Sequence, residues 1–201
     1  MLLVPAALVL MPVAAPVAAA DAALPPSARE DLVAIFTPKV RALGLRVTRA
    51  ALVDTANHRD AHGTHLAIYV EPTGDYTAQD YVDGVVDVTR AFLPYVFTRW
   101  KGLRSFDVCQ EPSPAVDARR EPAPETQVFA SRAGSRTIDW STADLATLVA
   151  RSEAAASTGG TRPVAFSVFL AAHLRDSPAY RATVGTTGGG TPEPPTTSTY
   201  G

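Results

Sequence analysis

The middle of the chain carries a strand, helix, strand pattern that restricts the fold more than any other feature. His65–Glu71 alternates apolar and polar residues, and Thr77 with Asp80 three positions later forms a capping-box signature for the start of a helix. Apolar residues then recur at helical spacing as far as Trp100, and Arg104–Gln110 returns to a strand pattern. A helix of this length between two strands predicts parallel neighbours joined by a right-handed crossover.

The flanking segments add strands and helices to this unit. Strand patterns cover 45–54, 126–131 and 164–170, although the last run is equally compatible with a buried helix and is interpreted as a strand. The segments 45–54 and 65–71 are predicted to form an antiparallel hairpin. Capping signatures at Ser27 with Glu30 and at Ser141 with Asp144 predict two further helices. We therefore expect an α+β fold, a mixed β-sheet of four to five strands with about three packed helices in a single domain.

Both ends of the chain differ from its centre. Residues 1–20 carry no charge and end in Val-Ala-Ala-Ala, which predicts a signal peptide or an N-terminal membrane anchor. Residues 185–201 are rich in Gly, Thr and Pro and predict a disordered tail, which leaves 21–184 as the α+β globular domain. A further proline-rich stretch, 111–125, is expected to be an exposed connection. Localisation is predicted to be secreted or cell envelope, with membrane contact only through an uncleaved N-terminus.

Composition excludes several functions. The 18 basic and 20 acidic residues nearly balance, and no basic run is interleaved with aromatics, so a nucleic-acid partner is not expected. The only dense glycine run lies in the tail, so no phosphate-binding loop for a nucleotide cofactor is present. Cys109 is the single cysteine, and an internal disulfide is therefore excluded.

Three of the four histidines, His58, His62 and His65, lie within eight positions. If the segment were helical, this spacing would place three imidazoles on one face, as a zinc site with one open position requires. Gly63 interrupts the segment and His65 is expected to begin a strand, so a polar hairpin loop is the competing interpretation. No cofactor is predicted, and zinc is retained only as an alternative.

Two glutamates end the parallel strands in the same way, each followed by a proline. If the strands are neighbours, Glu71 and Glu111 lie at one sheet edge, where α/β sheets often bind ligands. Such a pair can divide general acid and base roles, although a solvated strand end is the simpler explanation. Asp107 shares a face with Cys109, and it needs a partner if the strand is covered on both faces; the candidates for this partner are Arg99, Arg104 and Arg132. Cys109 itself is interpreted as a small buried apolar residue, with a nucleophile as the alternative.

These patterns do not identify a reaction. The sequence favours an exported or cell-envelope-associated binding or interaction protein without catalysis, whose partner is an unknown protein or small-molecule ligand. The alternative is a small extracellular hydrolase that uses either zinc on the histidine loop or the Glu71 and Glu111 carboxylates. These two hypotheses differ in one structural requirement, because an enzyme needs the named side chains to converge.

Overall fold

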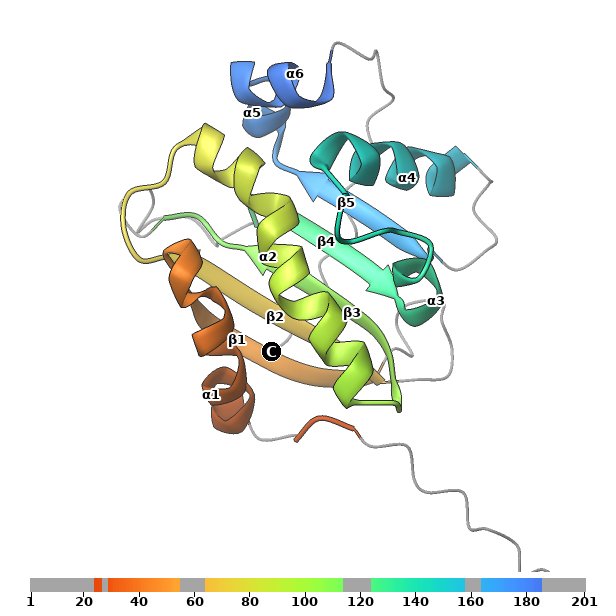
Figure 1. The fold of residues 1–201 in the computed structure, drawn as a ribbon. Helices are drawn as coiled ribbons and strands as arrows, with labels where there is room; N and C mark the ends of the chain where they lie inside the picture. The colour runs from red at the N-terminus through yellow and green to blue at the C-terminus, as the bar shows by residue number, and fades with distance from the viewer. Residues whose placement is uncertain (1–23, 27–28, 55–63, 114–123, 158–163, 186–201) are drawn as a thin grey trace, which may run out of the picture.

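A computed structural model describes residues 24–26, 29–54, 64–113, 124–157 and 164–185. Its centre is a five-stranded sheet in which spatial order follows sequence order (Figure 1). The strands are β1 (Leu45–Asp54), β2 (Thr64–Pro72), β3 (Leu103–Gln110), β4 (Thr126–Ser131) and β5 (Phe166–Leu170). Only β2 and β3 are parallel, and the other three neighbouring pairs are antiparallel. The predicted α+β class with one mixed sheet is confirmed, as are the β1–β2 hairpin and the β2–β3 parallel pair.

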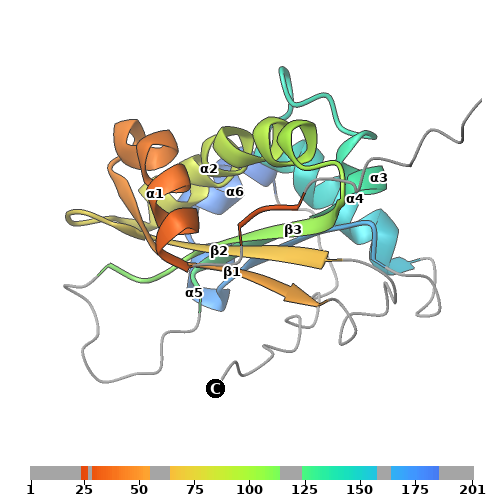
Figure 2. The same ribbon diagram turned by 90° about the horizontal axis from the view of Figure 1, so that it is seen from below.

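The helices gather mainly on one face of this sheet. In Figure 2 the helices α1 and α2 lie side by side above the strands, and α5 lies below the sheet at one end. The helical segments are α1 (Arg29–Val40), η1 (Arg41–Leu43), α2 (Ala78–Arg99), α3 (Arg132–Ser135), α4 (Leu145–Ser157), α5 (Ala172–Arg175) and α6 (Pro178–Val184). None of the helices in the described ranges is both long and apolar enough to span a bilayer.

The crossover helix α2 forms where the sequence predicts it. Thr77 caps its first turn, since the Thr77 hydroxyl accepts a hydrogen bond from the Asp80 backbone N–H and the Asp80 carboxylate accepts one from the Thr77 N–H. Its apolar stripe is buried against the sheet and α1, where Phe36 meets Phe92 edge-to-face at 5.5 Å between ring centroids. Burial of this stripe supplies most of the helix's stability, because helices in proteins are stabilised mainly by the packing of an amphipathic face.

The third predicted helix, α4, begins with a different capping residue from the one expected. The Ser141 hydroxyl donates to the Asp139 carboxylate, while Asp144 caps α4 by accepting from the Thr147 N–H at 2.8 Å. The predicted pairing of Ser141 with Asp144 is therefore wrong, although the helix is present. The first predicted capping box involves Ser27, which lies outside the described residues. Segments 1–20, 114–123 and 186–201 lie outside them as well.

The outer edge of β5 is protected by α4. The hydroxyl of Ser152 accepts a hydrogen bond from the Val168 backbone N–H at 3.1 Å, in a buried position. An unpaired strand edge offers a template for aggregation, and covering it with a helix is a common solution. The segment interpreted as a strand, 164–170, is thus confirmed as one over Phe166–Leu170, where buried and half-buried residues alternate.

Candidate functional site

The sheet face opposite α1 and α2 is unusually polar, and we call it the polar face. On β2 and β3 every second residue points to this side, because side chains alternate along a strand. The polar face is defined by Arg46, Thr48 and Arg49 of β1, His65, Tyr69 and Glu71 of β2, Ser105, Asp107 and Cys109 of β3, Glu111 just beyond it, and Gln127 of β4.

One end of the polar face is a buried hydrogen-bonded network. His65 and Ser105 are direct neighbours in the parallel register, and His65 Nδ1 lies 3.0 Å from the Ser105 hydroxyl. The other ring nitrogen, Nε2, lies 3.3 Å from Asp107 Oδ2. The same oxygen accepts a hydrogen bond from Gln127 Nε2 at 2.9 Å, and Phe129 stacks on the imidazole. His65 is 1% exposed, so both of its polar atoms depend on these partners.

The partner of Asp107 differs from the one expected. His65 and Gln127 contact its carboxylate, and the prediction of an arginine partner is wrong. Arg132 is engaged elsewhere, because its guanidinium donates to backbone carbonyls at the end of α2. The second carboxylate oxygen, Asp107 Oδ1, is buried and accepts no hydrogen bond. An unsatisfied buried acceptor costs about 1–3 kcal/mol, so this atom lowers the stability of the folded protein.

The grouping of Ser105, His65 and Asp107 has the composition of a catalytic triad but not its access. Ser105 is 0% exposed, so a substrate carbonyl cannot reach its hydroxyl. Its backbone is paired with β2 on one side and β4 on the other, which leaves no free N–H groups nearby for an oxyanion. We therefore treat this network as structural.

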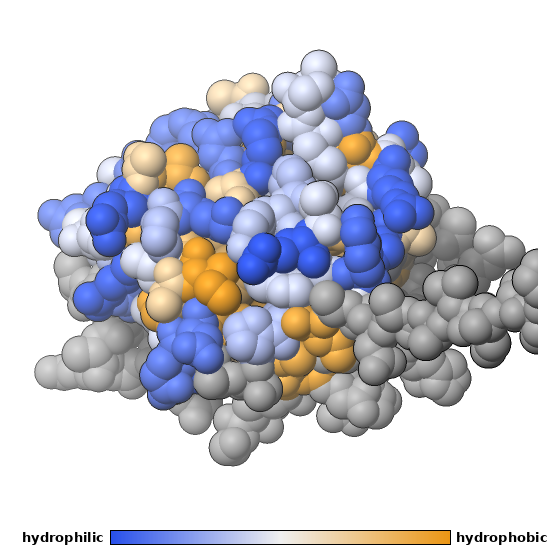
Figure 3. Space-filling model, turned by 60° about the horizontal axis from the view of Figure 1, so that its bottom comes forward, coloured by the Kyte–Doolittle hydropathy of each residue, from blue (hydrophilic) through white to orange (hydrophobic). Residues whose placement is uncertain are grey.

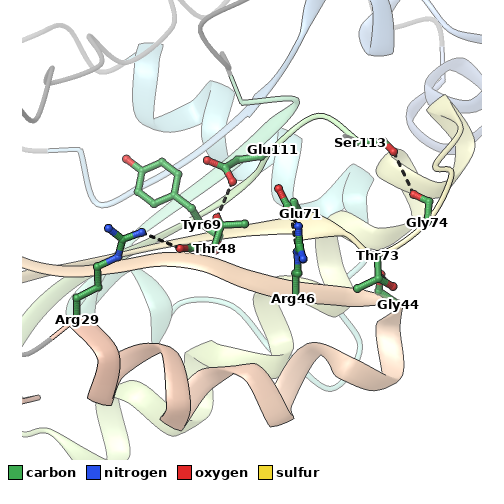
Figure 4. Close-up of polar contacts among 10 residues, drawn as sticks. All are labelled: Arg29, Gly44, Arg46, Thr48, Tyr69, Glu71, Thr73, Gly74, Glu111 and Ser113. Atoms are coloured by element: carbon green, nitrogen blue, oxygen red, sulfur yellow. Dashed lines mark hydrogen bonds and ion pairs between the residues drawn. The ribbon is translucent and has the colours of Figure 1, made fainter. Parts of the chain in front are cut away.

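At the other end of the polar face, the two predicted glutamates lie on the same sheet edge. The parallel register and the hydrogen bond from the Glu111 N–H to the Val70 carbonyl, 2.7 Å, bring the ends of β2 and β3 together. Figure 4 shows that each carboxylate meets a side chain from β1. Arg46 forms an ion pair with Glu71, and the Thr48 hydroxyl donates to Glu111 at 2.6 Å. The convergence of the strand ends follows from the sequence, whereas the β1 partners do not.

A β-bulge explains how Thr48 reaches Glu111. The β1–β2 register shifts between Val47 and Arg49, so Thr48 has no partner residue on β2. Its carbonyl accepts a hydrogen bond from Arg29 at 3.0 Å. Bulges leave no clear mark in a single sequence, and this is why the role of Thr48 was not predicted.

Charges on the polar face nearly balance. Arg49 covers the ring of Tyr69, with the guanidinium carbon 3.8 Å from the ring centroid, and the side chain of Arg46 is 60% exposed while that of Glu71 is 16% exposed. Carboxylates that accept hydrogen bonds and guanidinium groups that donate them are therefore presented side by side. Such a surface suits a polar ligand with little net charge.

Cys109 lies between the two ends of the polar face and is buried. Burial raises the pKa of its thiol well above the usual value, and the nearby carboxylates of Asp107 and Glu111 raise that pKa further. The thiolate is the nucleophilic form of cysteine. The environment therefore supports the interpretation of Cys109 as a packed apolar residue.

The histidine hypothesis is only partly within the described residues. His58 and His62 lie outside them, and His65 directs both ring nitrogens at Ser105 and Asp107. Within the described ranges, no group of three or more histidine, cysteine or acidic side chains is arranged to hold a metal ion. A zinc site that included His65 would have to replace one of its two contacts, so zinc binding stays a prediction.

Comparisons of the chain with protein-family models, with curated proteins and with solved structures produced no match.

Proposed function

We propose that this protein is an exported or cell-envelope binding protein without catalysis, and that the open end of the polar face holds a neutral, hydroxyl-rich ligand of the carbohydrate class. Export is inferred from the uncharged segment 1–20 and its Val-Ala-Ala-Ala ending. The binding proposal depends on one observation, the meeting of Glu71 and Glu111 with Arg46 and Thr48 at the edge where β2 and β3 end.

The chemistry of these groups favours hydroxyl ligands. A hydroxyl both donates and accepts hydrogen bonds, so it can pair with a carboxylate and a guanidinium at the same time. The near balance of acidic and basic side chains gives a neutral ligand an advantage over a strongly charged one. Tyr69, held under Arg49, adds an aromatic surface next to the carboxylates.

The described surface gives less support to binding through a large apolar interface. Figure 3 shows a side of the molecule on which hydrophilic residues predominate and hydrophobic areas are separate. Among the described residues, only Leu24 and Val164 are large hydrophobic side chains with high exposure. Protein interfaces of the obligate type need larger continuous apolar patches than this.

The hydrolase alternative uses the same two carboxylates. Two carboxyl groups that flank a glycosidic bond are the usual machinery of glycoside hydrolysis. Arg46 forms an ion pair with the Glu71 carboxylate, and the Thr48 hydroxyl donates to the Glu111 carboxylate. These contacts favour a role of both carboxylates in binding over a role in proton transfer. Product formation during the binding experiment separates these functions.

Isothermal titration calorimetry with maltotriose and with tri-N-acetylglucosamine tests the proposal. We expect saturable binding of at least one oligosaccharide. Glu111→Gln and Glu71→Gln each remove a charged acceptor, and each is expected to weaken that binding about tenfold, since a hydrogen bond to a charged group is worth about 1.5–3 kcal/mol. Glu30→Gln, on the exposed side of α1, is the matched control and is expected to leave affinity unchanged.

Two outcomes contradict the proposal. Absence of heat with both oligosaccharides in the wild-type protein removes the carbohydrate class, and equal losses in Glu30→Gln and Glu111→Gln remove the polar face as the site. Shortened sugars in the calorimeter cell, detected by mass spectrometry and lost in Glu111→Gln, would instead support the hydrolase.

Cell fractionation tests the export proposal independently. Expression of the full chain is expected to deliver protein outside the cytoplasm, with a mature N-terminus at Asp21 if the segment is cleaved as a signal peptide. Recovery of full-length protein only in the cytoplasm would contradict this proposal and leave the binding proposal untouched.

A further inference from the structure

A second site, which shares no residue with the polar face, lies at the carboxyl end of α2. It is a hollow of about 240 Å³ between the last turns of α2, the short helix α3 and the segment that leads to α4. Three of its lining residues are cationic, Lys101, Arg132 and Arg136. The other lining residues are Leu93, Pro94, Phe97, Thr98, Ser135 and Trp140.

Arg132 lines the hollow and has a structural role. Its guanidinium donates to the carbonyls of Phe97 at 2.8 Å, Trp100 at 2.5 Å and Leu103 at 2.7 and 3.0 Å. The last carbonyls of a helix lack hydrogen-bond donors within the helix. Arg132 donates to two such carbonyls, those of Phe97 and Trp100, and also to the carbonyl of Leu103 at the start of β3. Burial lowers the pKa of Arg132, and the positive charge of Arg136 lowers it further, which indicates that the two guanidinium groups are close.

Unlike Arg132, the exposed residues Lys101 and Arg136 do not donate to backbone carbonyls of the described residues. Neither takes part in an ion pair or a side-chain hydrogen bond within the described part of the chain. None of the described residues that line the hollow is acidic, and the carboxylate of nearby Asp139 accepts from the N–H and hydroxyl of Ser141. The three cationic side chains therefore outweigh the half negative charge at the end of α2 together with the ionised carboxylate of Asp139, so the hollow has a positive potential.

Trp140 adds an apolar and rigid side chain to the lining. The indole N–H of Trp140 donates to the Ser135 carbonyl at 2.8 Å, and Arg90 donates to the Trp140 carbonyl at 2.7 Å. These bonds fix the ring orientation without any ligand. A lining that combines an aromatic side chain with cations is suited to a molecule with one apolar and one anionic part.

We propose that this hollow binds a small organic anion, with a phosphate or carboxylate group at Lys101 and Arg136 and an apolar group against Trp140. The volume of the hollow is below the usual range for drug-sized ligands, so only small molecules fit. We expect such molecules to bind with about millimolar affinity. The site is independent of the carbohydrate proposal, because it shares no residue with the polar face.

Nitrogen–proton correlation NMR tests the proposal with phenyl phosphate, benzoate, inorganic phosphate and phenol at constant ionic strength. The chain has two tryptophans, so its indole region contains two signals, and Trp140→Phe assigns them. We expect phenyl phosphate or benzoate to shift the Trp140 signal saturably, inorganic phosphate to bind more weakly, and phenol to have no effect. Trp100, which packs against Phe36 and Tyr95, is the internal reference. The preference between phenyl phosphate and benzoate identifies the anionic group.

Charge-removing variants locate the anionic group. Lys101→Gln and Arg136→Gln are each expected to weaken binding about threefold and the double variant about tenfold, as for exposed ion pairs. Arg151→Gln, an exposed arginine on α4, is the matched control and is expected to change affinity less than twofold. No shift of Trp140 with either aromatic anion, equal binding of phenol, or an equal effect of Arg151→Gln would overturn the proposal.

Discussion

His65 Nε2 lies 3.3 Å from Asp107 Oδ2 within the sheet, and this contact links two strands that are 42 positions apart in the chain. Because both side chains are almost fully buried, neither can exchange its partner for solvent. The pair is therefore expected to matter for stability and not for ligand contact, in contrast to Glu71 and Glu111 at the open end of the same face.

Replacement of His65 by alanine tests this assignment. The change leaves the Ser105 hydroxyl and Asp107 without their shared partner and removes the ring that stacks on Phe129. We expect a loss of about 2–4 kcal/mol in the free energy of unfolding, measured by urea denaturation. His173→Ala is the comparison, because the His173 side chain is 62% exposed, and a loss below about 1 kcal/mol is expected there. Equal losses in the two variants would contradict a structural role for His65.

Gly134 is required by a close approach of two backbone segments. A Cβ at this position would lie 2.0 Å from the Ala165 carbonyl oxygen, which precedes β5. Gly134→Ala is expected to destabilise the protein by more than about 3 kcal/mol or to prevent folding, since backbone atoms cannot move aside cheaply. Gly74→Ala meets no atom within 4 Å and is the control. A folded Gly134→Ala protein with wild-type stability would contradict the close approach of α3 to Ala165.

Cys109 is expected to resist thiol reagents in the native state. Burial and the adjacent carboxylates raise its pKa, so little thiolate exists near pH 8 and the reagent has no path to it. Labelling with Ellman's reagent should be slow in buffer and rapid in 8 M urea. Rapid labelling of the folded protein would revive the nucleophile hypothesis.

Glu125 predicts a pH dependence of stability. Burial raises the pKa of this carboxyl above its ordinary value of 4.5, and the positive charge of His173, with Nε2 2.9 Å from Oε2, opposes this only in part. The folded state therefore binds the proton more tightly than the unfolded state does. This contribution is fully present below pH 4.5 and is lost as pH rises through the folded-state pKa.

The Glu125→Gln variant isolates that contribution. Its free energy of unfolding relative to the wild-type protein is expected to increase between pH 4 and pH 7, because the wild-type carboxyl must ionise in a buried position. Urea unfolding at several pH values measures the difference. A difference that is constant with pH, or that falls as pH rises, would show that the His173 charge dominates.

Local signals predicted the central part of the fold well. The capping box at Thr77 and the change from alternating to helical periodicity identify β2, α2 and β3, and the length of the crossover implies their parallel pairing. The same reasoning placed Glu71 and Glu111 at one edge. These features depend on residues that are close in sequence, where propensity and pattern are informative.

The parts that were not predicted depend on contacts between distant strands. The pairing of His65 with Ser105 and Asp107 requires the register of β2 on β3, and the reach of Thr48 to Glu111 requires a bulge. The short helices α3 and α5 contain too few residues to show a period. Asp107 was correctly expected to need a partner, but its identity depends on which β4 residue lies alongside.

The central claim is that the edge where β2 and β3 end is the ligand site, and amide chemical-shift mapping with the oligosaccharide that binds most tightly tests it most directly. We expect the largest saturable shifts to fall on residues 46–49, 69–73 and 109–113, and Glu111→Gln to need about tenfold more oligosaccharide to reach them. Shifts that are absent from these segments while the oligosaccharide binds elsewhere, or that saturate at an unchanged oligosaccharide concentration in Glu111→Gln, would contradict this claim.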